Sequence, residues 1–355
     1  MFNKTIGGLI TLIIGLVGLF MYVYYSIEAA EESTWPRHES VEDAGFNPET
    51  LEQARAYYDS INSTAAMVIY DGKVLFEWGS TTKSTNAHSV RKSMISALYG
   101  IEIEQETFRL FDTLEDYDID ENPSLTTIEK QASLSHLMTS SSGVYLPAGE
   151  ESIGMRMNRP SRGSYLPGQH YYYNNWDFNV LGTIYNEQTE SDIFEDFERR
   201  IAQPLGMEDF EMGHTQYKYE NRRSQHPSYL FRMSARDLAR FGQMYLQQGA
   251  WEGEQIVPED WVERSTRPHI EVPGNPLFDY GYLWWTATAP PFDELGMYSA
   301  VGRYGQSIDI IPELDLVFVH RVDSNRLAFQ FTRNSVNDLQ RLQLLQLILD
   351  SESSS

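Results

Sequence analysis

Ser89 and Lys92 stand three residues apart, a spacing that places both side chains on one face of a helix. A lysine whose pKa is lowered by burial can accept the proton of a serine hydroxyl, so the pair can act as nucleophile and base without histidine. Ser80 and Lys83 share the spacing but lie in a polar stretch that would leave the lysine solvated. Ser89 instead begins a segment with apolar residues at helical spacing, whose N-terminus would offer N–H donors to an oxyanion. We therefore predict Ser89 as the nucleophile and Lys92 as its base.

The elements that must position this pair are predicted from apolar runs and turn residues near both ends of the chain. We predict a helix over 48–61, a β-hairpin of 65–70 and 73–78 around Asp71-Gly72, and a helix from Ser89. Residues 105–225 are predicted to form short helical segments without alternating strands. A second hairpin of 306–311 and 316–320, with a turn at 312–315, is followed by an amphipathic helix over 335–350 that carries Leu339, Leu342, Leu345 and Leu349. Strands from distant parts of the chain with helices between them predict an α+β fold, with one antiparallel sheet flanked by helices. We expect residues 33–98 and 225–355 to form the sheet subdomain, and residues 99–224 to form an inserted helical subdomain.

The N-terminal residues 5–27 carry no charge and are long enough to cross a membrane as a helix. Lys4 precedes this segment and several glutamates follow it, so the positive-inside rule places the bulk of the chain outside the cytoplasm. A signal peptide is the alternative, but the segment is long and lacks a clean cleavage site. We predict that residues 1–32 are a single-pass anchor in the cytoplasmic (inner) membrane, with the catalytic domain on the periplasmic or extracytoplasmic side.

Composition excludes several classes of function. The 51 acidic against 27 basic residues give a net charge of −24 without a basic stripe, which disfavours nucleic acid as a partner. The chain has no cysteine, so thiol catalysis, cysteine-ligated zinc and disulfides are excluded. No two of the eight histidines lie within four residues of each other, so the sequence proposes no metal site, and we expect no cofactor.

Several segments, in order along the chain, resemble the β-lactamase and penicillin-binding-protein superfamily of serine hydrolases. The sequence Ser-Val-Arg-Lys at 89–92 is similar to its Ser-x-x-Lys motif, residues 138–144 resemble its "LLTHTSGL" stretch without the histidine, and residues 167–182 resemble "PGxxFxYSNxxYxLLG". Further matches lie at 204–207, 234–239 and 280–285, so the resemblance covers about residues 45–325. It implies the β-lactamase/transpeptidase-like fold and hydrolysis through an acyl-enzyme on Ser89.

The Tyr-x-Asn motif of this superfamily has three possible matches here, which begin at Tyr172, Tyr173 and Tyr219. The spacing from Pro167-Gly168 selects Tyr173 and Asn175. The resemblance implies that Tyr173 relays protons between Ser89, Lys92 and the leaving group. It also implies that Asn175 holds Lys92 and hydrogen-bonds the substrate. A phenol held near a lysine ammonium would favour its phenolate form and act as a base.

The third motif of the superfamily, Lys-Thr-Gly on the strand beside the nucleophile, is absent. The corresponding stretch, residues 297–306, contains Gly302 and Arg303 but no lysine or histidine, and is more similar to the esterase and 6-aminohexanoate-dimer hydrolase branch. We expect Gly302 to let the substrate approach the strand, a second oxyanion N–H to come from residues 300–304, and Arg303 to orient the substrate. Arg91 or Arg303 can replace the missing clamp for a substrate carboxylate.

The expected function is hydrolysis of small esters or amides, peptides included, by an exported, membrane-anchored serine hydrolase. A β-lactamase or D-Ala peptidase acting on cell-wall-type substrates is the alternative, and a catalytically silent binding module of the same fold is a second. The oligomeric state is left open.

Overall fold

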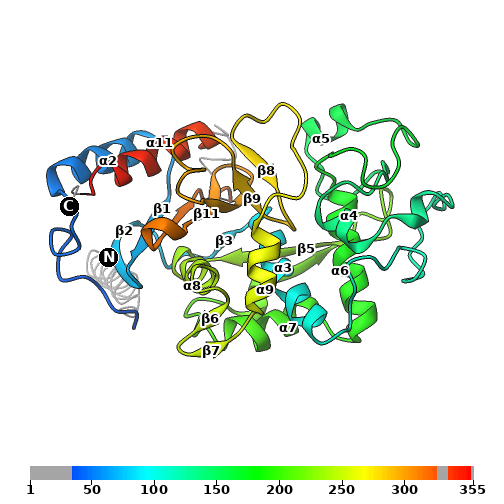
Figure 1. The fold of residues 1–355 in the computed structure, drawn as a ribbon, viewed down its shortest axis with the longest axis horizontal. Coiled ribbons are helices and arrows are strands. Elements are labelled where there is room, and N and C mark those ends of the chain that lie inside the picture. Colours follow the sequence, from blue (N-terminus) through cyan, green and yellow to red (C-terminus); the bar gives the residue numbers. More distant parts are fainter. Residues whose placement is uncertain (1–33, 326–334, 353–355) are drawn as a thin grey trace, which may run out of the picture. The chain divides into compact units, whose positions relative to one another are not determined.

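A seven-stranded antiparallel sheet forms the centre of the computed structural model, which describes residues 34–325 and 335–352 (Figure 1). Its strands come from both ends of the chain, and the N-terminal β1 pairs along its whole length with the C-terminal β12. In spatial order the strands are β2 (Lys73–Gly79), β1 (Ala65–Tyr70), β12 (Leu316–Arg321), β11 (Gln306–Ile311), β10 (Tyr298–Gly302), β9 (Trp285–Ala287) and β8 (Phe278–Tyr280).

Helices cover both faces of this sheet, which explains why its central strands are buried almost continuously. On one face, helices α2 (Pro48–Ser60) and α11 (Asp338–Leu349) lie side by side, in blue and red in Figure 1, over a core that both share with the strands. Helix α8 (Ala235–Leu246) packs on the other face. Helix α3 (Val90–Glu104) contacts β10 and β11 beside it.

The remaining elements are short helices and two small sheets. The helices are α4 (Leu134–Met138), α5 (Ile153–Asn158), α6 (Asn175–Thr189), α7 (Ile193–Phe197), α9 (Glu259–Thr266), the π-helical turn η2 (Glu198–Ala202) and the 3₁₀ turns η1 (Glu129–Gln131), η3 (Met212–His214) and η4 (Pro312–Leu314). The small sheets are β3 (Thr85–Asn86), β5 (Ser228–Met233) and β4 (Thr215–Lys218) in that order, and β6 (Ala250–Trp251) with β7 (Glu254–Gln255).

The predicted α+β class and both predicted hairpins are confirmed. The prediction that residues 105–225 hold no strand is wrong, because β4 pairs with β5. This strand is only four residues long and none of them is buried, so it lacks the apolar alternation that marks a strand in sequence. The predicted subdomain boundaries stay a prediction, although this small sheet spans the one at 224/225.

The last helix is shorter than predicted, because its N-cap is Asn337, whose side chain accepts a hydrogen bond from the backbone N of Gln340 at 2.9 Å. Leu339 is exposed, contrary to its predicted place on the apolar face. Leu342 and Leu345 are buried as predicted, and Ile348 is buried where Leu349 was predicted.

The predicted membrane segment, residues 5–27, lies outside the described residues. Within residues 34–325 and 335–352, no helix has the length and apolar character needed to span a bilayer.

Candidate active site

Ser89 is the N-cap residue of α3, immediately before its first turn. Serine at this position normally uses its hydroxyl to cap the helix, but the Ser89 side chain makes no capping hydrogen bond. The turn before it is tight: His88 has a φ of 49°, and its backbone N donates to Asn86 Oδ1 at 2.8 Å. The Ser89 hydroxyl is therefore left available for chemistry.

Arg321 holds this turn in place from the end of β12. Its Nη2 donates to the backbone oxygens of Thr85 at 2.8 Å and Met233 at 3.1 Å, so one guanidinium ties β3 and β5 to the main sheet. Burial lowers the pKa of Arg321 to about 9, and Asp323 opposes this effect. The backbone of β3, which leads into the turn before Ser89, is therefore held both by β5 and by the main sheet.

Lys92 brings the predicted site residues together. Its Nζ lies 3.2 Å from Ser89 Oγ, 2.8 Å from Tyr173 Oη and 3.1 Å from Asn175 Oδ1. The amine also lies 3.9 Å from the centre of the Phe178 ring. Lysine is almost never fully buried without a carboxylate partner, yet Lys92 is 1% exposed and its hydrogen-bonding partners are all neutral. This geometry fits an amine that accepts the serine proton.

The protonation states differ from the expectation of an ammonium beside a phenolate. Burial, with smaller contributions from Arg91 and Arg303, lowers the pKa of Lys92 well below its usual range. Burial also raises the pKa of Tyr173 to about 12, although its hydrogen bond with Ser89 and the same two arginines oppose the rise. Loss of hydration favours the uncharged form of both groups. Lys92 is therefore the candidate base, and Tyr173 the candidate proton donor.

These shifts predict the pH dependence of the reaction. Lys92 must be uncharged to act as a base, so kcat/KM for a neutral ester should fall as the pH drops through its pKa. Because that pKa is lowered, we expect the fall well below the ~10.4 of an exposed lysine. A pH–rate profile, corrected for the Ser89→Ala background, measures it. A rise in activity near pH 10 would contradict a buried neutral amine.

A buried polar network holds Tyr173 and Asn175 at the start of α6. Asn174 is the N-cap of this helix, and its backbone N donates to Ser140 Oγ at 2.8 Å. The Asn174 side chain and Ser142 Oγ both donate to Asp177 Oδ1, at 2.8 and 2.6 Å. Burial raises the pKa of Asp177 well above its usual range, and these hydrogen bonds oppose the rise. The serine-rich segment 139–143 thus acts by positioning the tyrosine and asparagine.

Gly302, at the end of β10, lies against the nucleophile's backbone. A Cβ built there would lie 2.7 Å from the Ala87 carbonyl oxygen and 3.1 Å from the backbone N of Ser89. A glycine at this position lets the strand approach the start of α3. The source of the second oxyanion N–H within residues 300–304 stays a prediction.

We expect Gly302→Ala to lower kcat/KM by about 10²-fold, because the added methyl group would push β10 away from Ser89 and misalign the oxyanion donors. Steady-state hydrolysis of a nitrophenyl ester measures the loss. Gly213→Ala is the matched control, since a Cβ there meets nothing within 4 Å. Equal activity in the two variants would show that β10 takes no part in the site.

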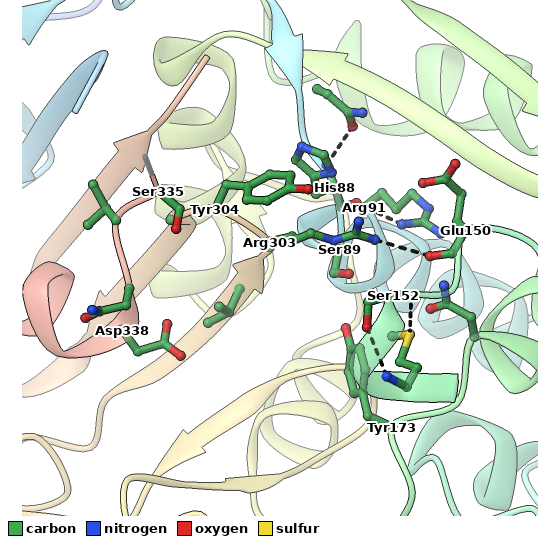
Figure 2. A pocket seen from close by; sticks show the side chains of 18 of the residues that line it. His88, Ser89, Arg91, Glu150, Ser152, Tyr173, Arg303, Tyr304, Ser335 and Asp338 are labelled. Atoms are coloured by element: carbon green, nitrogen blue, oxygen red, sulfur yellow. Dashed lines mark hydrogen bonds between the residues drawn. The ribbon is translucent and has the colours of Figure 1, made fainter. Parts of the chain in front are cut away.

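A cavity of about 530 Å³ opens over these residues (Figure 2). Ser89, Tyr173, Asn175, Gly302 and Arg303, all predicted from the sequence, line it. The sequence did not predict its other walls, which include His88, Glu150, Ser152, Met155, Leu230, Trp285, Val301 and Tyr304. Trp285 lies in the matched segment 280–285, and Val301 and Tyr304 lie in the stretch 297–306 that was compared with the third motif.

The second Ser-x-x-Lys pair is a surface feature, as predicted. Lys83 forms an ion pair with Asp323 at 2.6 Å, and about half of its side chain is exposed. Ser80 is also exposed, and neither residue lines the cavity over Ser89.

Comparison with known proteins matches this architecture to a family. Residues 49–343, most of the chain, match the family model described as Beta-lactamase. The chain belongs to the Beta-lactamase family. Its members are serine hydrolases, which agrees with the arrangement around Ser89. A search of curated protein sequences finds no match.

Solved structures show the same fold at low sequence identity. A candidate 6-aminohexanoate-dimer hydrolase from Bacillus anthracis has a TM-score of 0.66 at 21% identity, covering 90% of this chain and 87% of that one. A penicillin-binding protein homologue from Pyrococcus abyssi has a TM-score of 0.63 at 19% identity, covering 86% and 78%. The D-alanine carboxypeptidase AmpC from Burkholderia cenocepacia has a TM-score of 0.61 at 17% identity, covering 85% and 98%.

The departure from the Lys-Thr-Gly motif has a structural counterpart. If Gly302 takes the place of the motif's glycine, Ala300 takes the place of its lysine. An alanine side chain carries no charge, so this strand position offers no cation to a ligand. Among the described residues, no group of three or more His, Asp or Glu side chains is placed to hold a metal ion.

Proposed function

We propose that this protein is an exported, membrane-anchored serine hydrolase that cleaves small esters or amides through an acyl-enzyme on Ser89. The observation that carries the proposal is the buried Lys92 amine, whose pKa is lowered by burial, within hydrogen-bonding distance of Ser89, Tyr173 and Asn175. The membrane anchor and the extracytoplasmic location rest on the sequence of residues 5–27 alone.

In the proposed acylation, Lys92 accepts the Ser89 proton as Oγ attacks the carbonyl carbon of the substrate. The backbone N–H of Ser89, with a second donor from the end of β10, stabilises the oxyanion. Tyr173 is protonated at neutral pH because burial raises its pKa to about 12, so its hydroxyl can protonate the leaving group. The Lys92 ammonium then returns a proton to Tyr173. Water releases the acyl group by the reverse proton path.

Asn175 supports this path by fixing the lysine. Its Oδ1 accepts a hydrogen bond from Lys92, while its Nδ2 donates to the Gly149 carbonyl oxygen at 3.2 Å. The amide orientation is thus set by a partner on each side. Asn175 also lines the cavity, where it can contact the substrate.

A fluorophosphonate probe, followed by peptide mass spectrometry, tests the proposal. We expect one covalent adduct on Ser89 in the folded protein and none after heat denaturation. Turnover of 4-nitrophenyl butyrate should accompany it. Absence of both would favour a silent binding module of the same fold.

Nitrocefin and a D-Ala-D-Ala peptide distinguish the esterase from a β-lactamase or D-Ala peptidase. The uncharged Ala300 position makes us expect slow turnover of both compared with the ester. If the protein turns over nitrocefin or the D-Ala-D-Ala peptide faster than the ester, and Ser89→Ala loses this activity, the result would favour a β-lactamase or D-Ala peptidase.

A further inference from the structure

Glu150 lines the cavity over Ser89 in a backbone conformation that a glutamate rarely adopts (Figure 2). Its φ is 59°, in the left-handed region, where the Cβ of a residue other than glycine crowds the backbone. His88 and Tyr304, which also line the cavity, have φ values of 49° and 75°. Residues in this region persist where the surrounding structure holds them, and they gather at functional sites. The contacts that hold Glu150 therefore bear on its role.

The left-handed φ belongs to one orientation of the peptide group that joins Gly149 to Glu150. In this orientation the Gly149 carbonyl oxygen accepts hydrogen bonds from Asn175 Nδ2 at 3.2 Å and Asn179 Nδ2 at 3.5 Å. The N–H of the same peptide group points the other way and donates to Glu220 Oε2 at 2.7 Å. Because glycine tolerates either conformation, turning this peptide group over would return Glu150 to a negative φ and take the carbonyl away from Asn175. The unusual φ is therefore tied to the hydrogen bond that orients the Asn175 amide.

Charged groups from two other elements hold Glu150 in this orientation. Its carboxylate forms an ion pair with Lys218, the last residue of β4, whose Nζ also lies 3.9 Å from Glu220 Oε2. Its carbonyl oxygen accepts a hydrogen bond at 3.2 Å from Nη2 of Arg303, which belongs to the turn between β10 and β11 (Figure 2). The side chain, the N–H and the carbonyl of one residue thus each contact a charged group.

The surrounding charges also keep this carboxyl group ionised. Burial raises the pKa of Glu150, but the hydrogen bond and the charge of Lys218 lower it. Arg91 and Arg303 lower it further, and the net shift is downward. Arg91 is 3% exposed, and a buried guanidinium is costly unless a negative charge lies near it. A neutral side chain at position 150 would lose its interaction with all three cations.

Asn175 links this arrangement to the reaction. Its Oδ1 accepts a hydrogen bond from Lys92 Nζ at 3.1 Å, and the same amine lies 3.2 Å from Ser89 Oγ. We propose that Glu150 is a positioning residue, whose charged contacts hold the preceding peptide group in the orientation that directs the Asn175 amide. With this peptide group turned over, the amide would be free to present its NH₂ group to the lysine instead of its oxygen. The inference rests on the proposed function, because it places Glu150 behind the same proton path.

Glu150→Gln removes the charge and keeps the shape of the side chain. We expect kcat for 4-nitrophenyl butyrate to fall about tenfold to a hundredfold, since small misplacements of catalytic groups have effects of this size. KM should change by less than about twofold, because the ester is neutral and does not depend on this charge for binding. The same loss of kcat is expected with 4-nitrophenyl acetate, since the defect lies in the enzyme.

Lys218→Met breaks the same ion pair from outside the cavity and should lower kcat by a similar factor. Lys218→Arg should keep the activity, because arginine can pair with the same carboxylate. The double variant of Glu150→Gln and Lys218→Met should be little worse than either single variant, since residues that act through one contact are not additive. Lys218 is partly exposed, so its variants keep the test decisive if a substitution of Glu150 fails to fold.

Glu190 provides the matched control. It is a glutamate with a φ of 52° that is exposed and does not line the cavity. Glycine removes the crowding of a left-handed residue at either position. Glu190→Gly should therefore leave kcat unchanged, whereas Glu150→Gly should lower it at least as far as Glu150→Gln does.

Folded Glu150→Gln and Lys218→Met proteins with the wild-type kcat, or a loss that appears only in KM, would overturn the positioning role and leave the hydrolase intact. Equal losses in Glu150→Gly and Glu190→Gly would do the same. Wild-type protein that hydrolyses neither ester and is not labelled at Ser89 would overturn the proposed function, and the positioning role with it.

Discussion

Ser89→Ala is expected to abolish labelling by a fluorophosphonate and to lower kcat/KM for 4-nitrophenyl butyrate by about 10⁴-fold or more. The expectation follows from the geometry, in which Lys92 Nζ lies 3.2 Å from an Oγ that makes no capping hydrogen bond. Alanine removes the only atom that can form the acyl-enzyme, and loss of a nucleophile typically costs about 10⁴- to 10⁶-fold in kcat. Mass spectrometry of the labelled peptide and steady-state kinetics measure the two effects.

Ser80→Ala is the matched control, because Ser80 has a lysine at the same spacing but lies exposed and outside the cavity. It should label and turn over like the wild type. If Ser89→Ala kept its activity, or if both serine variants lost it equally, the assignment of the nucleophile would be wrong.

Lys92→Met is expected to lower kcat/KM by about 10³-fold while leaving the protein folded. General-base catalysis contributes about 10²- to 10⁴-fold, and this amine is the base that lies within reach of Ser89. Methionine keeps much of the side-chain volume in a site between the rings of Tyr173 and Phe178. Because a buried amine is costly, the free energy of unfolding should stay the same or rise. Ester kinetics and urea unfolding measure the two effects.

Lys83→Met serves as the control, since it removes a lysine that is half exposed and paired with Asp323. Lys83 does not line the cavity over Ser89, so activity should be unchanged. A Lys92→Met protein that is unstable and inactive would indicate a structural lysine. A Lys92→Met protein that is stable and fully active would show that Lys92 takes no part in the mechanism.

The fold and the four central site residues were accessible from the sequence, because local signals agree there with the tertiary structure. Turn residues between apolar runs predicted both hairpins that build the sheet. The apolar helix that follows it selected Ser89 over Ser80, and the spacing from Pro167-Gly168 selected Tyr173 over Tyr172 and Tyr219. The structure places Ser89, Tyr173 and Asn175 around one amine. Strand β4 escaped prediction because its four residues carry no apolar alternation.

What the sequence determined by itself was the identity of the reactive groups, since residue type and spacing specify a serine, a lysine, a tyrosine and an asparagine on elements that must converge. The tertiary structure alone decided their protonation, because a pKa depends on the burial and charges that the packed fold supplies. It lowers the pKa of Lys92 and raises the pKa of Tyr173, the reverse of what their proximity alone suggested. It also decided which arginines face the cavity, since Arg91 and Arg303 are 212 positions apart and meet only where β10 packs beside α3.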